Sequence, residues 1–179
     1  MNIFYLHRDP KVAAEYHCDK HVVKMILESA QLLSTAHRAL DGTLGKGSSV
    51  SGKRIVNRWV LPDEREQVLY QSCHVNHPSG VWTRANIDHY RWLYDLMYFL
   101  IGEYKYRYEG KVHKCEDLLQ PLLDAPYNIP IVDWADPPQA MPDDVKVVGD
   151  TVAAYRNYYK VHKVKFATWK VRGVPDWYK

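Results

Sequence analysis

The chain has 179 residues, of which 46% are hydrophobic and 25% are charged, and these values predict one compact soluble domain rather than two. Its net charge is +3, and its three cysteines lie far apart in the sequence, which is typical of a reduced cytoplasmic protein and argues against a disulfide scaffold. No apolar run approaches the roughly 20 residues of a membrane helix, and the first residues lack the pattern of a secretion signal. We therefore expect no membrane partner and no export.

The first two thirds of the chain are predicted to be largely helical. Residues 2–6 predict a short extended segment, and Asp9-Pro10 supplies a capping residue followed by a proline in the first turn of a helix. A long helix is expected from Pro10 to about Leu40, and the glycine- and serine-rich residues 41–54 are expected to form a flexible loop. Further helices are expected at 62–75, 81–108 and, as a short element, 114–123.

The last third of the chain predicts one more helix. Residues 125–149 are rich in proline, which excludes regular structure, so this stretch is expected to form an ordered strap across the surface. Asp150 is expected to cap a helix from about Thr151 to Trp169, within a basic segment, residues 150–179. Because strand signals are few, the expected fold is mainly α: a single compact domain of about five helices, with a short extended N-terminus and the proline-rich strap.

The long first helix carries a narrow polar stripe on an otherwise apolar cylinder. At 100° per residue, the residues that fall near one line are His17, His21, Lys24, Glu28, Gln31 and Thr35. This pattern favours a central helix whose one polar edge lines a cleft, although simple solvent exposure remains the alternative. Asp19 lies on the apolar side, where an unpaired carboxylate is costly, so we expect it to hold an arginine or a backbone amide from another segment.

A metal site is the first alternative for the histidines of this stripe. His17 and His21 have the i,i+4 spacing of helical metal ligands, and Cys18 and His21 combine on paper with Cys73 and His77 as a four-ligand zinc set. Structural zinc ligands usually come in pairs from tight turns, whereas Cys18 and His21 are predicted to lie within a helix. We therefore expect no metal and no cofactor.

Charge is unevenly distributed along the chain. From Arg156 onward there are seven lysines and arginines against one acid, a net charge of +6, whereas the preceding residues carry 17 basic and 20 acidic side chains, a net charge of −3. Such polarity favours an anionic partner, here DNA or a nucleotide.

Aromatic rings accompany many of these cations, as is typical of proteins that stack bases and hold phosphates. The motif "HPSGVWTR" combines a histidine, a tryptophan and an arginine near the start of a helix, where free amides attract anions. The residues expected to bind phosphate or base are His17, Trp82, Arg84, Arg156, Lys163, Lys165, Trp169, Lys170 and Arg172.

Four motifs carry a resemblance to known proteins. "CDKHVVKMILESAQLLSTAHR", "NHPSGVWTR", "AYRNYY" and the closing W-x-x-R-G-x-P-D-W resemble a family of small phage-encoded proteins of poorly defined activity. More distantly, the short apolar start, the long first helix and the "PDWYK" tail are similar to phage pyrimidine-dimer DNA glycosylases, which are single-domain, mainly helical enzymes. The resemblance implies an N-terminal amine nucleophile, here on Met1, and a helical glutamate as acid/base, for which Glu15 and Glu28 are the candidates. It also implies the cytoplasm of an infected bacterial host.

Three functions follow from these observations. The first is an enzyme of the base-excision type, an N-glycosylase and abasic lyase acting on damaged or modified pyrimidine DNA, with His21, Lys24, Glu28 and His77 as its catalytic residues. The second is a metal-independent phosphodiesterase acting on a cyclic or linear nucleotide, with His21 and His77 as acid and base. The third is a non-enzymatic protein that binds a nucleotide or nucleic acid. The sequence predicts no oligomeric state.

Overall fold

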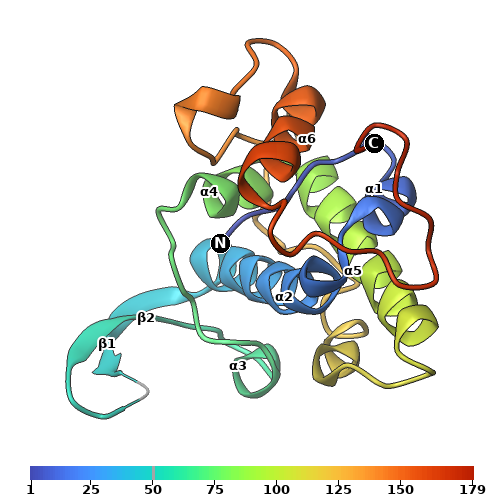
Figure 1. Cartoon of the computed structure of the whole chain (residues 1–179). Coiled ribbons are helices and arrows are strands. Elements are labelled where there is room, and N and C mark those ends of the chain that lie inside the picture. The colour runs from blue at the N-terminus through green and yellow to red at the C-terminus, as the bar shows by residue number, and fades with distance from the viewer. Residues whose placement is uncertain (50) are drawn as a thin grey trace.

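The computed structural model describes residues 1–49 and 51–179; Val50, in the expected loop 41–54, lies outside the described residues (Figure 1). Helices account for 47% of the chain, so helix is the dominant element although about half of the residues lie outside it. The described elements are α1 (Pro10–Tyr16), α2 (Asp19–Asp41), β1 (Thr43–Ser48), β2 (Ile55–Val60), α3 (Arg65–Val68), α4 (Pro78–Ala85), α5 (Ile87–Arg107), the 3₁₀ helices η1 (Lys114–Leu118) and η2 (Asp143–Val145), and α6 (Thr151–His162).

Helix α2 crosses the middle of the molecule and packs against α4 and α5, while α1 also packs against α5 (Figure 1). Met25, Ile26 and Leu33 of α2 are completely buried in one hydrophobic core with Leu93 and Met97 of α5. Each such side chain contributes about 1.5–3 kcal/mol through burial. The predicted central helix is therefore present, and its burial on most sides explains its mostly apolar sequence.

The expected single helix from Pro10 to Leu40 is interrupted at His17 and Cys18. Both residues have extended backbone conformations, with ψ of 133° and 160°, so α1 ends at Tyr16 and α2 begins at Asp19. The break leaves backbone carbonyls without helical partners, and the buried guanidinium of Arg107 donates to two of them, those of Glu15 and His17. A residue some 90 positions away thus stabilises the break, which explains why local sequence does not reveal it.

The expected helix at 62–75 is reduced to the four residues of α3, after which the chain is extended. Arg38, a completely buried residue of α2, explains this difference. Its guanidinium donates to the carbonyls of Trp59, Glu66, Leu69 and Tyr70, and to the Glu66 carboxylate at 2.5 Å. A helix continuing past Leu69 would use the carbonyls of Glu66, Leu69 and Tyr70 internally, so the arginine favours the extended path.

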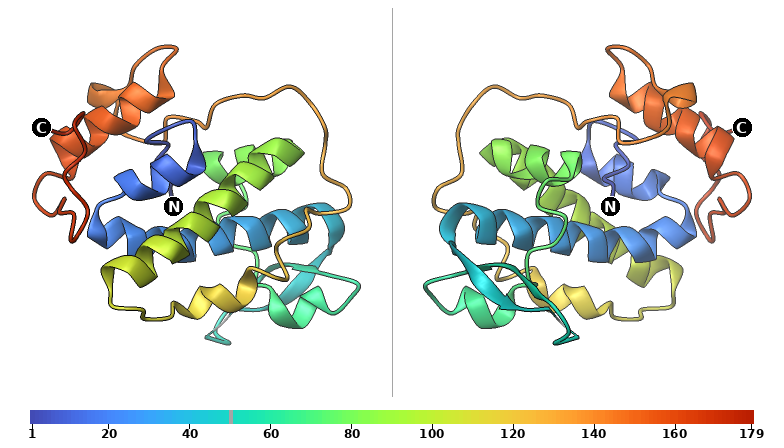
Figure 2. Two further views of the ribbon diagram at one scale, coloured as in Figure 1. Left: turned by 90° about the vertical axis from the view of Figure 1, so that its right-hand side faces the viewer. Right: turned by 90° about the vertical axis from the view of Figure 1, so that its left-hand side faces the viewer.

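The expected helix at 81–108 is two helices, because Asn86 between α4 and α5 is extended (φ −156°, ψ 142°). Its side-chain oxygen caps α5 by accepting from the amide of Asp88, and its Nδ2 donates to the carbonyl of Val132. Val132 belongs to the proline-rich strap, which passes outside α4 and α5 (Figure 2). Ile131 and Val132 of the strap are largely exposed, whereas Ile129 packs against the core, and the Trp134 ring lies 5.7 Å from that of Trp82, so hydrogen bonds and these two side chains hold the strap.

Residues 41–54 do not form a loop throughout, because 43–48 form strand β1. It pairs antiparallel with β2, from Thr43 opposite Val60 to Ser48 opposite Ile55, and this hairpin projects from the helices (Figure 1). Gly47 of β1 lies under the side chain of Arg58, and a Cβ there would collide with it. Glycine in this strand therefore permits a close cross-strand approach rather than flexibility.

Helix α6 begins at Thr151 under the expected cap, with the Asp150 carboxylate accepting from the amide of Ala153 at 2.9 Å. It ends at His162 rather than at Trp169, and the following residues return to the α1–α2 break, where the amide of Asp19 donates to the carbonyl of Thr168. Among the described residues, no helix has the length and apolar character needed to cross a membrane.

Candidate active site

A cavity of about 420 Å³ lies where the start of the chain meets α2, α6 and the residues after α6. We call it the base cavity. Its walls are Met1, Asn2 and Phe4 from the first segment, Lys20, His21, Lys24 and Glu28 from α2, and Ala140, Tyr158, Lys163 and Phe166 from the C-terminal third. The polar edge of α2 therefore lines a cavity, and three of the four expected catalytic residues share it.

Glu28 connects α2 to the first segment. Its Oε2 accepts a hydrogen bond from the backbone amide of Asn2 at 2.9 Å, and its Oε1 lies 3.3 Å from the Nζ of Lys24. The Glu28 side chain is only 12% exposed, whereas that of Lys24 is 64% exposed. The carboxylate is thus fixed beside the first two residues, and its partner lysine remains open to solvent.

His21 is held in a neutral form inside the cavity wall. Its Nδ1 lies 2.6 Å from the hydroxyl of Tyr159, and its ring packs against Phe4 with centroids 4.2 Å apart. Burial lowers the pKa of His21 to about 2, and the neighbouring positive charges of Lys163 and Lys24 act in the same direction. At neutral pH this imidazole is therefore a hydrogen-bonding group and not a source of protons.

Aromatic rings form the apolar part of the cavity. Phe4 and Tyr158 are stacked with an interplanar angle of 12° and centroids 5.8 Å apart, and Phe166 meets His21 edge to face. Phe4 has a φ of 55°, a left-handed conformation that a bulky side chain adopts only at a cost. The surrounding structure thus holds this ring in the cavity against a local backbone preference.

Three lysines surround these rings. Lys163 lies 4.1 Å from the centroid of the Tyr158 ring and donates to its hydroxyl at 3.0 Å. Lys20 lies 5.2 Å from the centroid of the Phe166 ring, and Lys24 pairs with Glu28. The lining residues thus include three cations and one acid, so the cavity suits a ligand with an aromatic part and negative charge.

His77 lies beside the base cavity but does not line it. Its Nδ1 caps α4 by accepting from the amide of Ser79 at 3.2 Å. Burial lowers the pKa of His77, the amino group of Met1 and His74 lower it further, and Glu28 raises it.

Three expected binding residues lie elsewhere. His17 is completely buried, with Nδ1 2.7 Å from the carbonyl of Ala13, because the chain leaves the helix there; its expected place on the polar edge is wrong. Trp82 is buried and donates to the carbonyl of Ala135 in the strap. The guanidinium of Arg84 donates to the carbonyl of Val75 at 2.7 Å, away from the cavity. These side chains have structural contacts rather than a place in the site.

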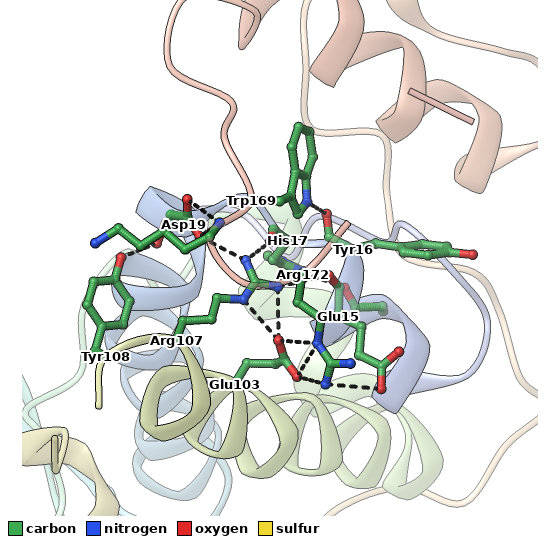
Figure 3. Close-up of polar contacts among 11 residues, drawn as sticks. Glu15, Tyr16, His17, Asp19, Glu103, Arg107, Tyr108, Trp169 and Arg172 are labelled. Atoms are coloured by element: carbon green, nitrogen blue, oxygen red, sulfur yellow. Dashed lines mark hydrogen bonds and ion pairs between the residues drawn. The ribbon is translucent and has the colours of Figure 1, made fainter. Parts of the chain in front are cut away.

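The C-terminal cations do not form one surface either. Arg172 binds Glu103 with an Nη2–Oε1 distance of 2.6 Å, and Glu103 also accepts from Arg107 (Figure 3). Trp169 is buried and donates to the carbonyl of Tyr16, and the amide of Lys170 donates to Asp19. These residues close the α1–α2 break. Lys163 lines the base cavity, Arg156 lines a second cavity, and Lys165 is exposed and lines neither of them.

Asp19 has the partners that its burial demands. Its carboxylate accepts from Arg107 at 3.1 Å, from the hydroxyl of Thr168 at 2.8 Å and from the amide of Lys170 at 3.0 Å (Figure 3). We expected Asp19 to hold an arginine or a backbone amide from another segment, and it binds one of each, Arg107 and the amide of Lys170. Asp19 is therefore a structural residue at the start of α2.

Six residues of the base cavity were not singled out from the sequence. They are Asn2, Phe4, Lys20, Ala140, Tyr158 and Phe166. Tyr158 lies within the quoted motif "AYRNYY", and Phe4 lies in the expected extended start, but nothing local relates either segment to α2. Only tertiary contacts bring them to the cavity.

No group of three or more histidines, cysteines, aspartates or glutamates arranged to hold a metal ion occurs in residues 1–49 and 51–179. Of the zinc set considered from sequence, Cys18 is completely buried, whereas Cys73 interacts with Thr35 and the Met1 sulfur.

Comparison of the chain with protein-family models, with curated proteins and with solved structures finds no match.

Proposed function

We propose that this protein is a DNA-processing enzyme of the base-excision type, which opens the N-glycosidic bond of a damaged or modified pyrimidine in the base cavity. The observation that carries the proposal is the 2.9 Å hydrogen bond between Glu28 and the amide of Asn2, in a cavity that Met1 also lines. A helical glutamate next to the first residues is the arrangement that the resemblance to pyrimidine-dimer glycosylases implies.

The rings of the cavity support recognition of a base removed from its stack. Enzymes that act on bases in DNA take the nucleotide out of the duplex and hold it between aromatic or apolar side chains. Phe4, Tyr158 and Phe166 offer such faces, and the cavity of about 420 Å³ lies within the size range of small-molecule sites. The neutral His21 adds a hydrogen-bonding ring nitrogen, Nε2, because its Nδ1 is engaged by Tyr159.

The lysines support binding of the phosphates on either side of that nucleotide. Lys20 and Lys24 are exposed on one edge of α2, and Lys163 faces them from beyond α6. Neutralising backbone phosphates supplies affinity that is independent of sequence and falls with salt. Base recognition and phosphate recognition are thus divided between the rings and the cations.

Glu28 is the acid/base of the proposed reaction. A nucleophile attacks C1′ of the deoxyribose, the bond between C1′ and the pyrimidine nitrogen breaks, and its electron pair leaves with the base, which takes up a proton. With water as the nucleophile, Glu28 accepts the proton that the water loses, and an abasic sugar results. His77 caps α4 and does not line the cavity, so it takes no step in this reaction.

With the amino group of Met1 as nucleophile, the same site acts as a lyase. The amine nitrogen bonds to C1′ and loses its protons, the base departs, and the C1′–O4′ bond opens as O4′ is protonated, which gives an imine. Removal of a proton from C2′ then expels the 3′ phosphate by β-elimination. Glu28 is the group placed to move these protons.

The phosphodiesterase alternative receives less support from this geometry. It needs one protonated and one neutral histidine, yet burial lowers the pKa of both His21 and His77. Only His21 lines the base cavity, and Arg84, the expected phosphoryl ligand, donates to a backbone carbonyl instead. No observation favours this reaction over base excision.

The test is base release from duplex oligonucleotides that each carry one damaged or modified pyrimidine whose ring is not bonded to a neighbouring base. We expect base release by the unmodified protein and a loss of at least about 100-fold in Glu28→Gln, since an acid/base group typically contributes that much. The matched control is Glu64→Gln, which removes the same charge from an exposed residue before α3 and should retain full activity. Equal rates of base release for Glu28→Gln and Glu64→Gln would contradict the catalytic role of Glu28.

Borohydride distinguishes the two nucleophiles. Trapping should give a covalent adduct if the Met1 amine attacks, and adding two residues before Met1 should abolish the adduct while leaving any water-dependent base release intact. Oligonucleotide binding without release of any tested base would instead identify a binding protein.

A further inference from the structure

A second cavity, of about 550 Å³, lies between the first segment, α6 and the C-terminal tail. We call it the basic cavity. The residues that matter among its walls are His7, Arg8, Arg156, Asn157, Lys160 and Trp177. None of them lines the base cavity, so this is a separate hollow on the same helix.

The basic cavity carries unbalanced positive charge. Its one acidic lining residue, Asp150, uses its carboxylate to cap α6. Within the described part of the chain, the exposed Arg8 and Lys160 and the half-buried Arg156 have no carboxylate at ion-pair distance, whereas Arg65 and Arg172, half-buried like Arg156, each bind acids. Cations left unpaired around a hollow indicate an anionic ligand.

Arg156 is held in a conformation ready for such a ligand. Its Nε donates to the carbonyl of Leu6 at 3.1 Å, and its guanidinium carbon lies 5.3 Å from the ring centroid of Trp177 and 5.7 Å from that of Tyr16. Its two terminal nitrogens have no hydrogen-bond acceptor in residues 1–49 and 51–179. A fixed guanidinium with both terminal groups free matches the geometry of a phosphate.

The two cavities lie a short distance apart along the same two segments. On α6, Tyr158 lines the base cavity and Arg156 the basic cavity; on the first segment, Phe4 lines the former and His7 the latter. At 100° per residue, Arg156 and Tyr158 point to nearly opposite sides of α6, so at least the width of a helix with its side chains, about 10–12 Å, separates the two cavities. Since one strand of B-DNA rises about 3.4 Å per nucleotide, this separation covers at least about three nucleotides.

We infer that the basic cavity holds a backbone phosphate of the same nucleic-acid strand whose nucleotide occupies the base cavity, a few nucleotides away. This inference rests on the proposed function, because it takes the base cavity as the site of that nucleotide. Arg156 is the fixed ligand of the phosphate, and Arg8 and Lys160 add mobile positive charge. The ligand is thus a strand long enough to reach both cavities.

The experiment measures binding of fluorescent single-stranded oligonucleotides of one, two, four and eight nucleotides, at several salt concentrations. The variants are Arg8→Gln and Lys160→Gln, which change exposed side chains that make no ion pair in the described structure. The matched control is Lys111→Gln, an exposed lysine after α5 that lines neither cavity. Arg156→Gln is less suitable alone, because Arg156 also contacts Leu6 and Trp177.

We expect affinity to rise between one and four nucleotides in the unmodified protein. Each cavity variant should weaken binding of the eight-nucleotide strand about three- to tenfold and lower the slope of log affinity against log salt by about 0.7, the value for one phosphate contact on a single strand. The same variants should leave mononucleotide binding unchanged, and Lys111→Gln should leave both unchanged.

Three outcomes would overturn the inference. They are equal effects of the cavity variants and the control, a mononucleotide that is weakened as much as the eight-nucleotide strand, and affinity that does not depend on length. The second outcome would identify an independent site for a small phosphate ester. Because binding is measured separately from base release, failure of excision with length-dependent binding intact would count against the proposed function alone.

Discussion

Arg107 Nη1 lies 3.1 Å from Asp19 Oδ1, so the last residue of α5 binds the first residue of α2 in the interior of the protein. The pair does more than neutralise charge. The same guanidinium donates to the carbonyls of Glu15 and His17, which the break between α1 and α2 leaves free, and to the carboxylate of Glu103. This arginine therefore determines that two helices form where one is expected.

Replacing Arg107 with methionine should strongly destabilise the fold. The change leaves Asp19 and two carbonyls without this donor, and removing one partner of a buried ion pair costs about 3–5 kcal/mol. Arg91→Met is the control, since Arg91 and Asp88 form an exposed pair 3.6 Å apart, which contributes at most about 1 kcal/mol. Urea unfolding measures both, and a similar loss in the two variants would contradict the structural role of Arg107.

Glu28 and Glu103 are both buried glutamates, but the same substitution should affect them differently. Glutamine at 28 can still accept from the amide of Asn2, so Glu28→Gln should cost less than about 1 kcal/mol. Glutamine at 103 cannot neutralise Arg107 and Arg172, so Glu103→Gln should cost about 3 kcal/mol or more. Thermal and urea unfolding measure the loss of stability in each variant. A strongly unfolded Glu28→Gln would mean that its loss of activity does not report on catalysis.

Stability should decline as the pH falls below the ordinary pKa of histidine. Burial lowers the pKa of His21 to about 2 and those of His17 and His37 to about 4. In the unfolded chain these groups bind protons below a pH of about 6.5, while in the folded chain they stay neutral, so acid favours unfolding.

Each of these histidines should remove up to about 1.4 kcal/mol of stability per pH unit, from a pH of about 6.5 down to its folded pKa. Urea midpoints between pH 7 and pH 4.5 measure the slope. Substituting His37 by glutamine should reduce the slope by about one proton, and the unmodified protein is the reference. An unchanged slope in the His37 variant would show that this residue gains a proton in the folded protein.

Two glycines should respond in opposite directions to alanine. At Gly42, where α2 ends, a Cβ would lie 2.5 Å from the carbonyl oxygen of Arg38 and 3.2 Å from the Trp59 Cβ, so Gly42→Ala should cost about 1–3 kcal/mol. At Gly102, on the exposed side of α5, a Cβ meets nothing within 4 Å, so Gly102→Ala should stabilise the protein by about 0.5–1 kcal/mol. Melting temperatures of the two variants show whether each substitution raises or lowers the stability.

The sequence predicted helices better than their ends. Apolar periodicity and capping residues indicate where helices exist, because these signals are local, and the caps Asp9 and Asp150 are present as expected. The breaks depend instead on Arg38, Arg107 and Asn86, whose partners are far away in the chain. Periodicity gives no information on such partners, so one helix was expected where two form.

The same distinction applies to the site. His21, Lys24 and Glu28 could be grouped from sequence because they lie on one helix at regular spacing. Phe4 and Tyr158 could not, since their positions follow from how the two ends of the chain meet α2. The unpaired guanidinium of Arg156 could not either, since its cavity forms between the first segment, α6 and the C-terminal tail. The net charge of the C-terminal segment did not show which of its cations are available to a ligand, because Arg172 forms an ion pair with Glu103 within the protein.

The closure of the α1–α2 break by residues 168–172 has a consequence for biosynthesis. The Asp19 carboxylate accepts a hydrogen bond from the amide of Lys170, and the Tyr16 carbonyl accepts one from the indole of Trp169. Each bond joins residues about 150 positions apart in the chain. A chain still being elongated on the ribosome can form α2 and α5, but it cannot complete this joint until residues 168–172 have emerged. The base cavity, whose far wall includes Lys163 and Phe166, is therefore among the last parts of the protein to take shape, and an incompletely synthesised chain lacks it.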